Sequence, residues 1–301
     1  MSGEKVRRRH KGPRWWRRLR YMIEYAALRF VGFVMRLLPM DTASGFMGWC
    51  WRMMAPRLRR HPRALAHLAL AYPEKSAAER ERIALAMWTN LGRVFAESFF
   101  VERLLASGRI EDRVAPLLET LKSSHRGIVF VSAHYGNWEL AITPTMTAGI
   151  KAAGVYQRVK NDYVEALLMA LRRERYPRGL FAKGTDIARR LMRVAREGGA
   201  VAMLADLRDR GGLPVPFFGR LAPSTNFPAA LCRSTDAALV AARVIRVKGA
   251  RFIIEAEVIQ VPRTDDRDAD IAETTRRIQS KFEGWIREYP DHWMWAHRRW
   301  G

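Results

Sequence analysis

The sequence of 301 residues predicts an α/β fold, in which a central and mostly parallel sheet is flanked by helices. From about residue 127 onward, short apolar runs alternate with longer segments whose apolar residues recur at helical spacing. This alternation is typical of chains in which helices cover the faces of a parallel sheet. An apolar content of 49% is ample for a large hydrophobic core.

The first forty residues (1–40) are expected to form a basic arm and an amphipathic, membrane-associating helix, followed by one larger domain over residues 41–301. Nine of the first 20 side chains are Lys or Arg, against one acidic side chain, Glu4. The whole chain carries 53 Lys and Arg against 30 Asp and Glu, a formal charge of +23. Such a balance predicts an anionic partner, and charge alone leaves open nucleic acid, an acidic membrane, a phosphorylated lipid or an acidic carrier protein.

Behind the basic arm, apolar side chains recur at helical spacing over residues 19–38 and form one stripe. Every window long enough to span a bilayer is interrupted by charged side chains, which are Glu24, Arg29 and Arg36. We therefore expect a helix that lies along a membrane interface, where indole rings such as those of Trp15 and Trp16 prefer to reside. The alternatives are a spanning helix and a helix packed on its own domain.

Pro39 ends this first helix, and helical spacing then dominates as far as about Leu121. Five strands are expected beyond that point, over residues 127–133, 154–159, 200–205, 238–247 and 251–259. Five helices are expected between and after them, over residues 137–149, 164–176, 185–197, 226–234 and 268–288. Asn137 suits the N-cap of the first of these helices, and the pair Gly198-Gly199 ends the third.

The block from Ser132 to Glu139 follows a continuous apolar run and combines an imidazole with a carboxylate. A hydroxyl that attacks a thioester needs a neutral imidazole to take its proton, and a nearby carboxylate holds that imidazole in one tautomer. His134 and Glu139 fit these two roles. Gly136 allows a sharp turn between them, and the N-cap at Asn137 places Glu139 in the first turn of a helix.

His134 and Asp206 each directly follow a predicted strand. Because open α/β sheets bind ligands beyond the carboxyl ends of their strands, both side chains are expected near a ligand site. The chain has no G-x-S-x-G sequence that would indicate a serine nucleophile, and we do not expect Ser132 to act as one. Cys50 and Cys232 lie far apart without metal-ligand spacing, so neither a disulfide framework nor a zinc site is expected.

The block His134-Tyr135-Gly136-Asn137-Trp138-Glu139-Leu140 resembles the signature of the late acyltransferases of bacterial lipid A biosynthesis, the lauroyl and myristoyl transferases. Residues 214–219 and 290–300 resemble two further blocks of that family, so the resemblance covers nearly the whole chain. It implies transfer of a fatty acyl chain from acyl carrier protein to a hydroxyl of a lipid A precursor, directly and without an acyl-enzyme. In that reaction His134 is the base and Glu139 its orienting partner, and no cofactor or metal is needed.

The resemblance also suggests substrate-binding residues. Arg158 matches an Arg after the second strand, where a guanidinium suits a phosphate. Asp206 matches the Asp of a strand-end Asp-Gln pair, with Leu207 in place of Gln. The further candidates are Asn137, together with Phe217, Phe218 and Gly219, which either line the acyl pocket or belong to the core.

The tail from Pro290 to Trp300 is rich in aromatic and basic side chains. We expect Trp293, Trp295 and Trp300 to pack on the core first, with Arg298 and Arg299 facing phosphates.

The sequence thus predicts an acyltransferase at the cytoplasmic face of a bacterial inner membrane. Its expected partners are acyl carrier protein, anionic membrane lipids and a phosphorylated glycolipid acceptor. A glycerophospholipid acyltransferase that accepts a lysophospholipid is the alternative enzyme. A non-catalytic basic protein that binds membranes or nucleic acid is a more distant alternative. Nucleic acid is not expected as a partner, because no zinc finger, RNA-binding aromatic motif or helix-turn-helix spacing is present.

Overall fold

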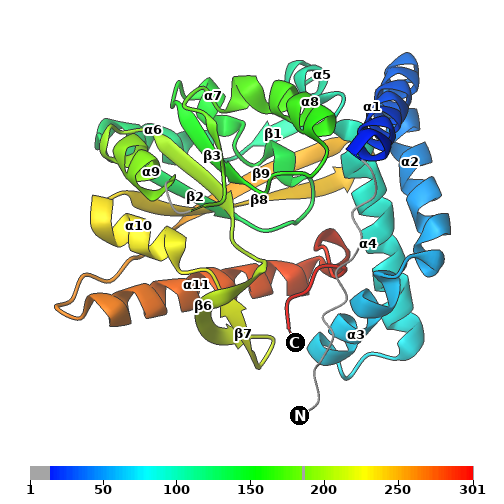
Figure 1. The fold of residues 1–301 in the computed structure, drawn as a ribbon. Coiled ribbons are helices and arrows are strands. Elements are labelled where there is room, and N and C mark those ends of the chain that lie inside the picture. Colours follow the sequence, from blue (N-terminus) through cyan, green and yellow to red (C-terminus); the bar gives the residue numbers. More distant parts are fainter. Residues whose placement is uncertain (1–13, 185–186, 301) are drawn as a thin grey trace, which may run out of the picture.

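The computed structural model describes residues 14–184 and 187–300, and it confirms the predicted α/β class. Its central seven-stranded sheet has the order β1-β9-β8-β2-β5-β3-β4 (Figure 1). The bounds of these strands, in that order, are Ile110–Asp112, Arg251–Ile259, Ala238–Lys248, Ile128–Ser132, Ala200–Leu204, Ala152–Tyr156 and Leu180–Ala182. Neighbouring strands are parallel except for β8 and β9, which form the expected antiparallel hairpin.

Helices cover both faces of this sheet because the side chains of its central strand alternate between two apolar cores. In β2, Val129 and Val131 belong to one core, while Ile128 and Phe130 belong to the other. The first core is covered by α9 (Ile187–Arg196), α10 (Phe227–Thr235) and α11 (Arg267–Glu288). The second is covered by α5 (Val101–Ala106), α6 (Ala115–Ser123) and α7 (Pro144–Thr147).

The N-terminal helices lie together at one side of the molecule (Figure 1). They are α1 (Arg14–Leu37), α2 (Met40–Met54), the 3-10 turn η1 (Ala55–Arg57), α3 (His61–Ala71) and α4 (Ala77–Glu97). A capping box begins α4, where the Ser76 hydroxyl accepts from the Glu79 backbone and the Glu79 carboxylate accepts from the Ser76 N–H. This long helix reaches from α3 to the end of β8, where Arg246 donates to Glu97.

Helix α1 packs on α8 (Asp162–Arg172) and on α2, and Met35 near its C-terminal end is buried in the second core. The Asn161 amide donates to the backbone oxygen of Tyr21 and to the carboxylate of Glu24, both at 2.9 Å. Most of the predicted apolar stripe points to solvent instead, as Ile23 is 59% exposed and Phe30 is 66% exposed. The basic arm before Arg14 lies outside the described residues.

None of the described helices combines the length and the apolar character that crossing a bilayer requires. Within residues 14–184 and 187–300, the part of the α1 stripe that includes Ile23 and Phe30 is exposed, while Val31, Val34 and Leu38 pack against the second core. Its role at a membrane stays a prediction.

Four elements differ from the sequence-based expectation. The expected helix 137–149 is replaced by the 3-10 turn η2 (Trp138–Leu140) and the short α7, because Pro144 lacks the N–H that a continuous helix needs. The edge strands β1 and β4 have three residues each, too few for a recognisable period. A separate hairpin, β6 (Arg208–Phe217) with β7 (Arg220–Ser224), was not expected because two Gly and two Pro in β6 are typical of a loop.

Candidate active site

A cavity of about 580 Å³ lies beyond the carboxyl ends of β2, β5 and β3, where a parallel sheet is expected to bind its ligand. His134 and Glu139 both line it. Its wall is otherwise largely apolar and comes from α2, α4, α8 and the sheet, with Trp51, Leu91, Phe95, Phe130, Ile142 and Leu168 among the lining residues. Such a wall suits a hydrocarbon chain.

His134 is paired with Asp206. The strands β2 and β5 are neighbours with Ser132 opposite Leu204, and each chain continues for two residues to His134 and Asp206. His134 Nδ1 lies 2.8 Å from Asp206 Oδ1, and the His134 backbone N–H donates to Asp206 Oδ2 at 2.9 Å. The sheet register itself therefore sets the separation of the two groups.

Asp206 is almost completely buried and is held by a third donor, because the indole N–H of Trp293 donates to Oδ2 at 2.8 Å. Burial alone raises the pKa of the Asp206 carboxyl, but the His134 imidazole and backbone N–H and the Trp293 indole outweigh burial and hold that pKa well below its usual range. Asp206 is a carboxylate at neutral pH. It fixes the imidazole tautomer in which Nδ1 carries the proton and Nε2 is free to act as a base.

The expected pairing of Glu139 with the imidazole is wrong. The Glu139 carboxylate accepts from Arg172 Nε at 3.0 Å and Nη2 at 2.5 Å, and from Arg175 Nη2 at 3.2 Å. These arginines belong to α8 and the turn η3 (Arg173–Arg175) that follows it. Because residues 138–140 form a 3-10 turn and not the first turn of an α-helix, Glu139 faces α8.

Glu139 is nonetheless an ionised group in the cavity wall. Burial raises its pKa, but the Arg172 and Arg175 guanidinium groups outweigh burial, so the pKa lies below its usual range. Glu139 thereby fixes Arg172, which also lines the cavity. Its requirement in catalysis stays a prediction.

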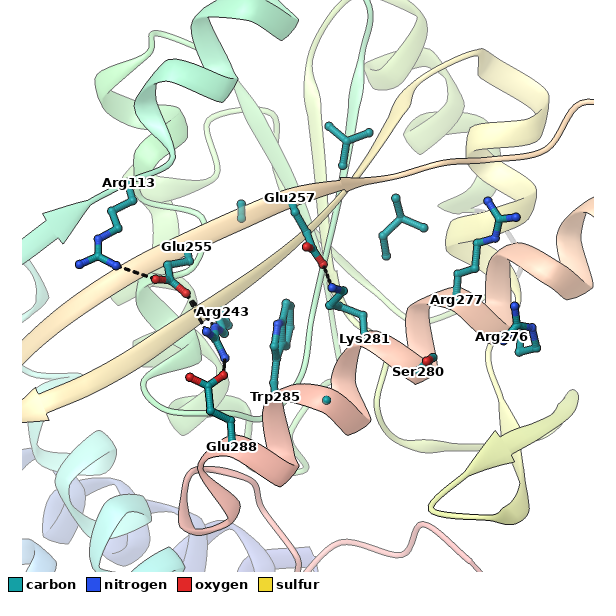
Figure 2. A pocket seen from close by; sticks show the side chains of 14 residues that line it. Arg113, Arg243, Glu255, Glu257, Arg276, Arg277, Ser280, Lys281, Trp285 and Glu288 are labelled. Carbon is teal, nitrogen blue, oxygen red and sulfur yellow. Dashed lines mark hydrogen bonds and ion pairs between the residues drawn. The ribbon is translucent and has the colours of Figure 1, made fainter.

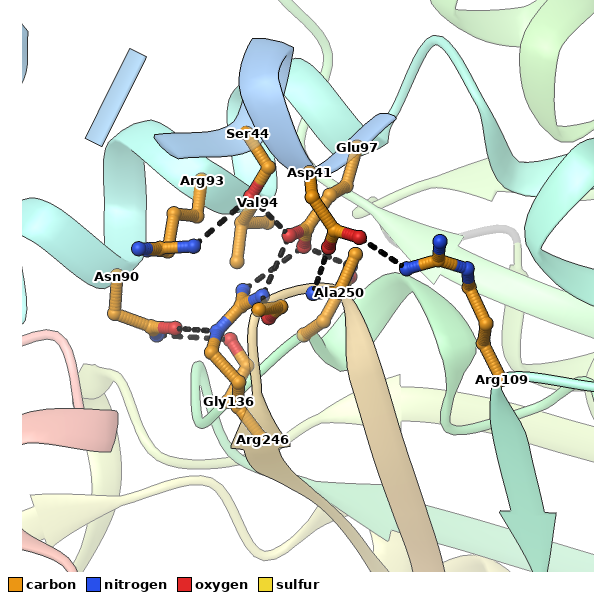
Figure 3. Close-up of polar contacts among 12 residues, drawn as sticks. Asp41, Ser44, Asn90, Arg93, Val94, Glu97, Arg109, Gly136, Arg246 and Ala250 are labelled. Carbon is orange, nitrogen blue, oxygen red and sulfur yellow. Dashed lines mark hydrogen bonds and ion pairs between the residues drawn. The ribbon is translucent and has the colours of Figure 1, made fainter. Parts of the chain in front are cut away.

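A buried polar network supports the turn after His134 from behind (Figure 3). Arg246 donates to both Glu97 carboxylate oxygens, at 2.5 and 2.8 Å, and to Asn90 Oδ1 at 2.9 Å. Asn90 in turn donates to the backbone oxygen of Gly136 at 3.1 Å. The Asn137 side chain donates to Glu97 Oε2 at 2.9 Å and does not cap a helix. It therefore contacts Glu97 instead of facing the cavity where a substrate contact was expected. Asn137 is a buried support of the turn.

Gly136 is required by this turn. Its φ is +57°, and an added Cβ would lie 1.7 Å from the Val244 backbone oxygen. We expect Gly136→Ala to lower the free energy of unfolding by about 1–3 kcal/mol or more, from backbone strain and this contact. Urea unfolding measures the loss. Gly108→Ala is the matched control, because Gly108 has a similar φ of +63° with open space around its Cβ position. An equal loss in both variants would show that the contact with Val244 adds nothing.

The side chains of the other expected substrate-binding residues do not line the cavity. Arg158 is in the loop after β3, exposed, with Nη2 3.0 Å from Asp162 Oδ1. Phe217 and Phe218 are buried in an aromatic core with Trp293, Trp295 and Trp300, and Gly219 completes the turn between β6 and β7. These two Phe side chains therefore belong to the core and not to the acyl pocket. A phosphate contact by Arg158 stays a prediction.

The aromatic tail packs as expected and also completes the site. Tyr135 and Trp293 form an antiparallel bridge, and the Met294 N–H donates to the His134 backbone oxygen at 3.1 Å. Arg299 does not face a phosphate, because it is fully buried and donates to Pro223, Ser224 and Gln279.

His297 is a site residue that the sequence reasoning missed. Its ring centroid lies 5.0 Å from that of His134, and both rings line the cavity. Burial and the neighbouring His134 lower the pKa of His297 to about 4, so this ring is neutral near pH 7. The signal for it in the sequence is its place in the tail block 290–300, which resembles a block of the family. Within the described residues, no group of three His, Cys, Asp or Glu is placed to hold a metal ion.

A larger hollow of about 820 Å³ between β9 and α11 contains neither His134 nor Asp206 (Figure 2). Each cationic side chain that lines it is paired with a carboxylate, and Arg276 and Arg277 share Glu273. Arg243 pairs with Glu255 and Glu288, Arg113 pairs with Glu255, and Lys281 pairs with Glu257. Size alone therefore does not identify the site, and the chemistry points to the cavity at His134.

The comparison with known families agrees with this geometry. The family model described as bacterial lipid A biosynthesis acyltransferase matches residues 10–301. No match was found among curated proteins. The match confirms the resemblance seen in the sequence and spans the His134 turn, Asp206 and the aromatic tail. The chain therefore belongs to the bacterial lipid A biosynthesis acyltransferase family.

Proposed function

We propose that this acyltransferase moves a fatty acyl chain from the thioester of acyl carrier protein to a hydroxyl of a lipid A precursor, with His134 as general base. The observation that carries the proposal is the His134–Asp206 pair at the end of a mainly apolar cavity. The apolar wall receives the acyl chain, and the imidazole receives the proton of the attacking hydroxyl.

In the proposed reaction, His134 Nε2 takes the proton as the acceptor oxygen attacks the thioester carbonyl carbon. The tetrahedral intermediate collapses, the carbon–sulfur bond breaks, and the imidazolium returns its proton to the leaving thiolate. Asp206 stabilises the imidazolium through the 2.8 Å contact with Nδ1. No side-chain nucleophile is needed, and the Ser132 hydroxyl is turned toward the Ala133 backbone oxygen at 3.4 Å.

The basic surface suits the proposed partners. A formal charge of +23 favours an acidic carrier protein, anionic lipid headgroups and a phosphorylated acceptor. These partners meet at the cytoplasmic face of a bacterial inner membrane, where we place the protein.

Acceptor exchange tests the proposed substrate class. Purified protein with acylated carrier protein is expected to add one acyl mass to a lipid A precursor and to leave lysophospholipids largely unchanged, as measured by mass spectrometry. Acylated coenzyme A serves as the comparison donor. Preferential acylation of lysophospholipid would move the protein to the alternative reaction and would leave the chemistry of His134 in place.

The membrane contact is expected to involve the exposed face of α1. We expect Phe30→Gln/Phe33→Gln to lower the affinity for anionic vesicles at least about tenfold, as measured by co-sedimentation. Moving one Phe side chain out of water contributes about 1.5–3 kcal/mol to binding. Leu221→Gln/Val247→Gln is the control, since both residues are apolar and more than 60% exposed on other elements. Equal vesicle binding by the two double variants would place the membrane contact elsewhere.

A further inference from the structure

Five arginines surround a second, smaller pocket that adjoins the catalytic cavity. This arginine pocket has a volume of about 320 Å³ and is lined by Arg60, Arg63, Arg208, Arg210 and Arg298. Leu207, Arg208 and His297 line both the arginine pocket and the catalytic cavity. The two spaces therefore share a wall, and that wall includes the ring that lies against His134.

Within the described part of the chain, no carboxylate neutralises the positive charge of the arginine pocket. Within residues 14–184 and 187–300, no carboxylate forms an ion pair with any of its five arginines. Arg63 donates only to the backbone oxygen of Ala296, at 3.3 Å. Arg208 Nε is buried without a hydrogen-bond partner in the same part of the chain. In the hollow between β9 and α11, by contrast, Arg113, Arg243 and Lys281 are held by glutamates (Figure 2).

Backbone geometry adds to this positive potential. Arg60 is the N-cap of α3 and Arg63 lies in its first turn, so the positive end of an eleven-residue helix borders the pocket. The same two arginines contribute to lowering the pKa of His297, after burial and His134. A partly exposed cationic pocket whose arginines have no carboxylate partner among the described residues suits an anion, and planar guanidinium groups match the geometry of phosphate oxygens.

We propose that the arginine pocket binds a phosphate group of the glycolipid acceptor and thereby places the acceptor hydroxyl at His134. This inference rests on the proposed function and names the residues that recognise the acceptor. An exposed Arg158, paired with Asp162, is a weaker candidate for this contact.

The position of the pocket favours the acceptor over the donor. A phosphate on a sugar of the acceptor lies close to the hydroxyl of an acyl group on that sugar. The phosphate of the carrier arm is separated from its thioester by two amide units, so we expect this phosphate to lie far from His134. The arginine pocket lies near His134, because it shares His297 with the catalytic cavity.

The test compares acceptors with and without their phosphate groups. We expect Arg60→Gln/Arg298→Gln to lower kcat/KM about 10- to 100-fold on the phosphorylated acceptor, mainly through KM, and less than about twofold on the dephosphorylated one. Both residues are exposed, so folding is expected to be unaffected. Arg59→Gln/Arg251→Gln is the matched control, because it removes two exposed charges outside the pocket and is expected to behave as the unmodified protein.

Two kinetic results would overturn the proposal. One is an equal loss on both acceptors, which would make the effect independent of acceptor phosphate. The other is a loss that vanishes when acyl-pantetheine without phosphate replaces the acylated carrier protein, which would assign the pocket to the donor.

Direct binding separates this inference from the proposed reaction. Calorimetry with micelles of the phosphorylated and dephosphorylated glycolipid is expected to show a phosphate-dependent affinity that the Arg60→Gln/Arg298→Gln protein lacks. If the unmodified protein transfers no acyl chain but shows this affinity, the proposed reaction fails and the pocket stands. If it transfers acyl chains with no phosphate dependence of binding, the pocket fails and the reaction stands.

Discussion

His134→Ala is expected to reduce acyl transfer by about 10²–10⁴-fold, the usual contribution of a general base. Among the described side chains that line the cavity, the His134 imidazole has its Nδ1 paired with a buried carboxylate, which leaves Nε2 as the base. Single-turnover assays with acylated carrier protein and lipid A precursor measure the loss, and circular dichroism checks the fold. His297→Ala is the matched control, because it removes the neighbouring ring and leaves the contact with Asp206. Turnover of His134→Ala close to that of the unmodified protein would eliminate the proposed mechanism.

Asp206→Asn is expected to cost a similar factor of about 10²–10⁴, because the amide keeps the shape of the carboxylate but not the charge that stabilises the imidazolium. A second readout distinguishes this role from a purely structural one. The carboxylate charge acts only once the imidazole has taken the proton of the attacking hydroxyl, so the loss is expected in kcat, with KM for both substrates nearly unchanged. A general loosening of the site would raise KM as well.

Glu139→Gln is the comparison for Asp206→Asn. Glu139 binds Arg172 and Arg175 instead of the imidazole, so Glu139→Gln is expected to act mainly on KM, through the released Arg172 in the cavity wall. A loss confined to kcat in Glu139→Gln, with no loss in Asp206→Asn, would restore the pairing first expected from the sequence.

The sequence was sufficient for the class of fold and for the individual polar residues at the strand ends. The apolar runs around Val129 and Val201 are continuous because strands in the middle of a parallel sheet are buried on both faces. His134 and Asp206 were each recognisable as residues that follow such a run. Their pairing was not, because β5 lies beside β2 in space although β3 and β4 separate them in the chain.

Nearness in sequence misled the assignment of the carboxylate partner. Glu139 is five residues from His134, but Pro144 shortens the helix that would have brought the two together, and the 3-10 turn directs Glu139 to α8. Arg299 was misassigned for a related reason, and the same reason left Phe217 open between the acyl pocket and the core. Aromatic and cationic side chains occur both in cores and in ligand sites, so residue type alone does not distinguish a core from a site. The packing of Arg299 over the Phe217 ring, which places both in the core, is visible only in the tertiary structure.

His134 and Asp206 lie two residues beyond the ends of the adjacent strands β2 and β5. Because local opening begins in elements with few buried contacts, we expect the largely exposed helix α1 to open before these two strands separate. Trp293 ties the tail into the same cooperative unit through its indole contact with Asp206. Separation of β2 from β5 requires unfolding of the centre of the sheet, so we expect loss of activity on heating to coincide with global unfolding.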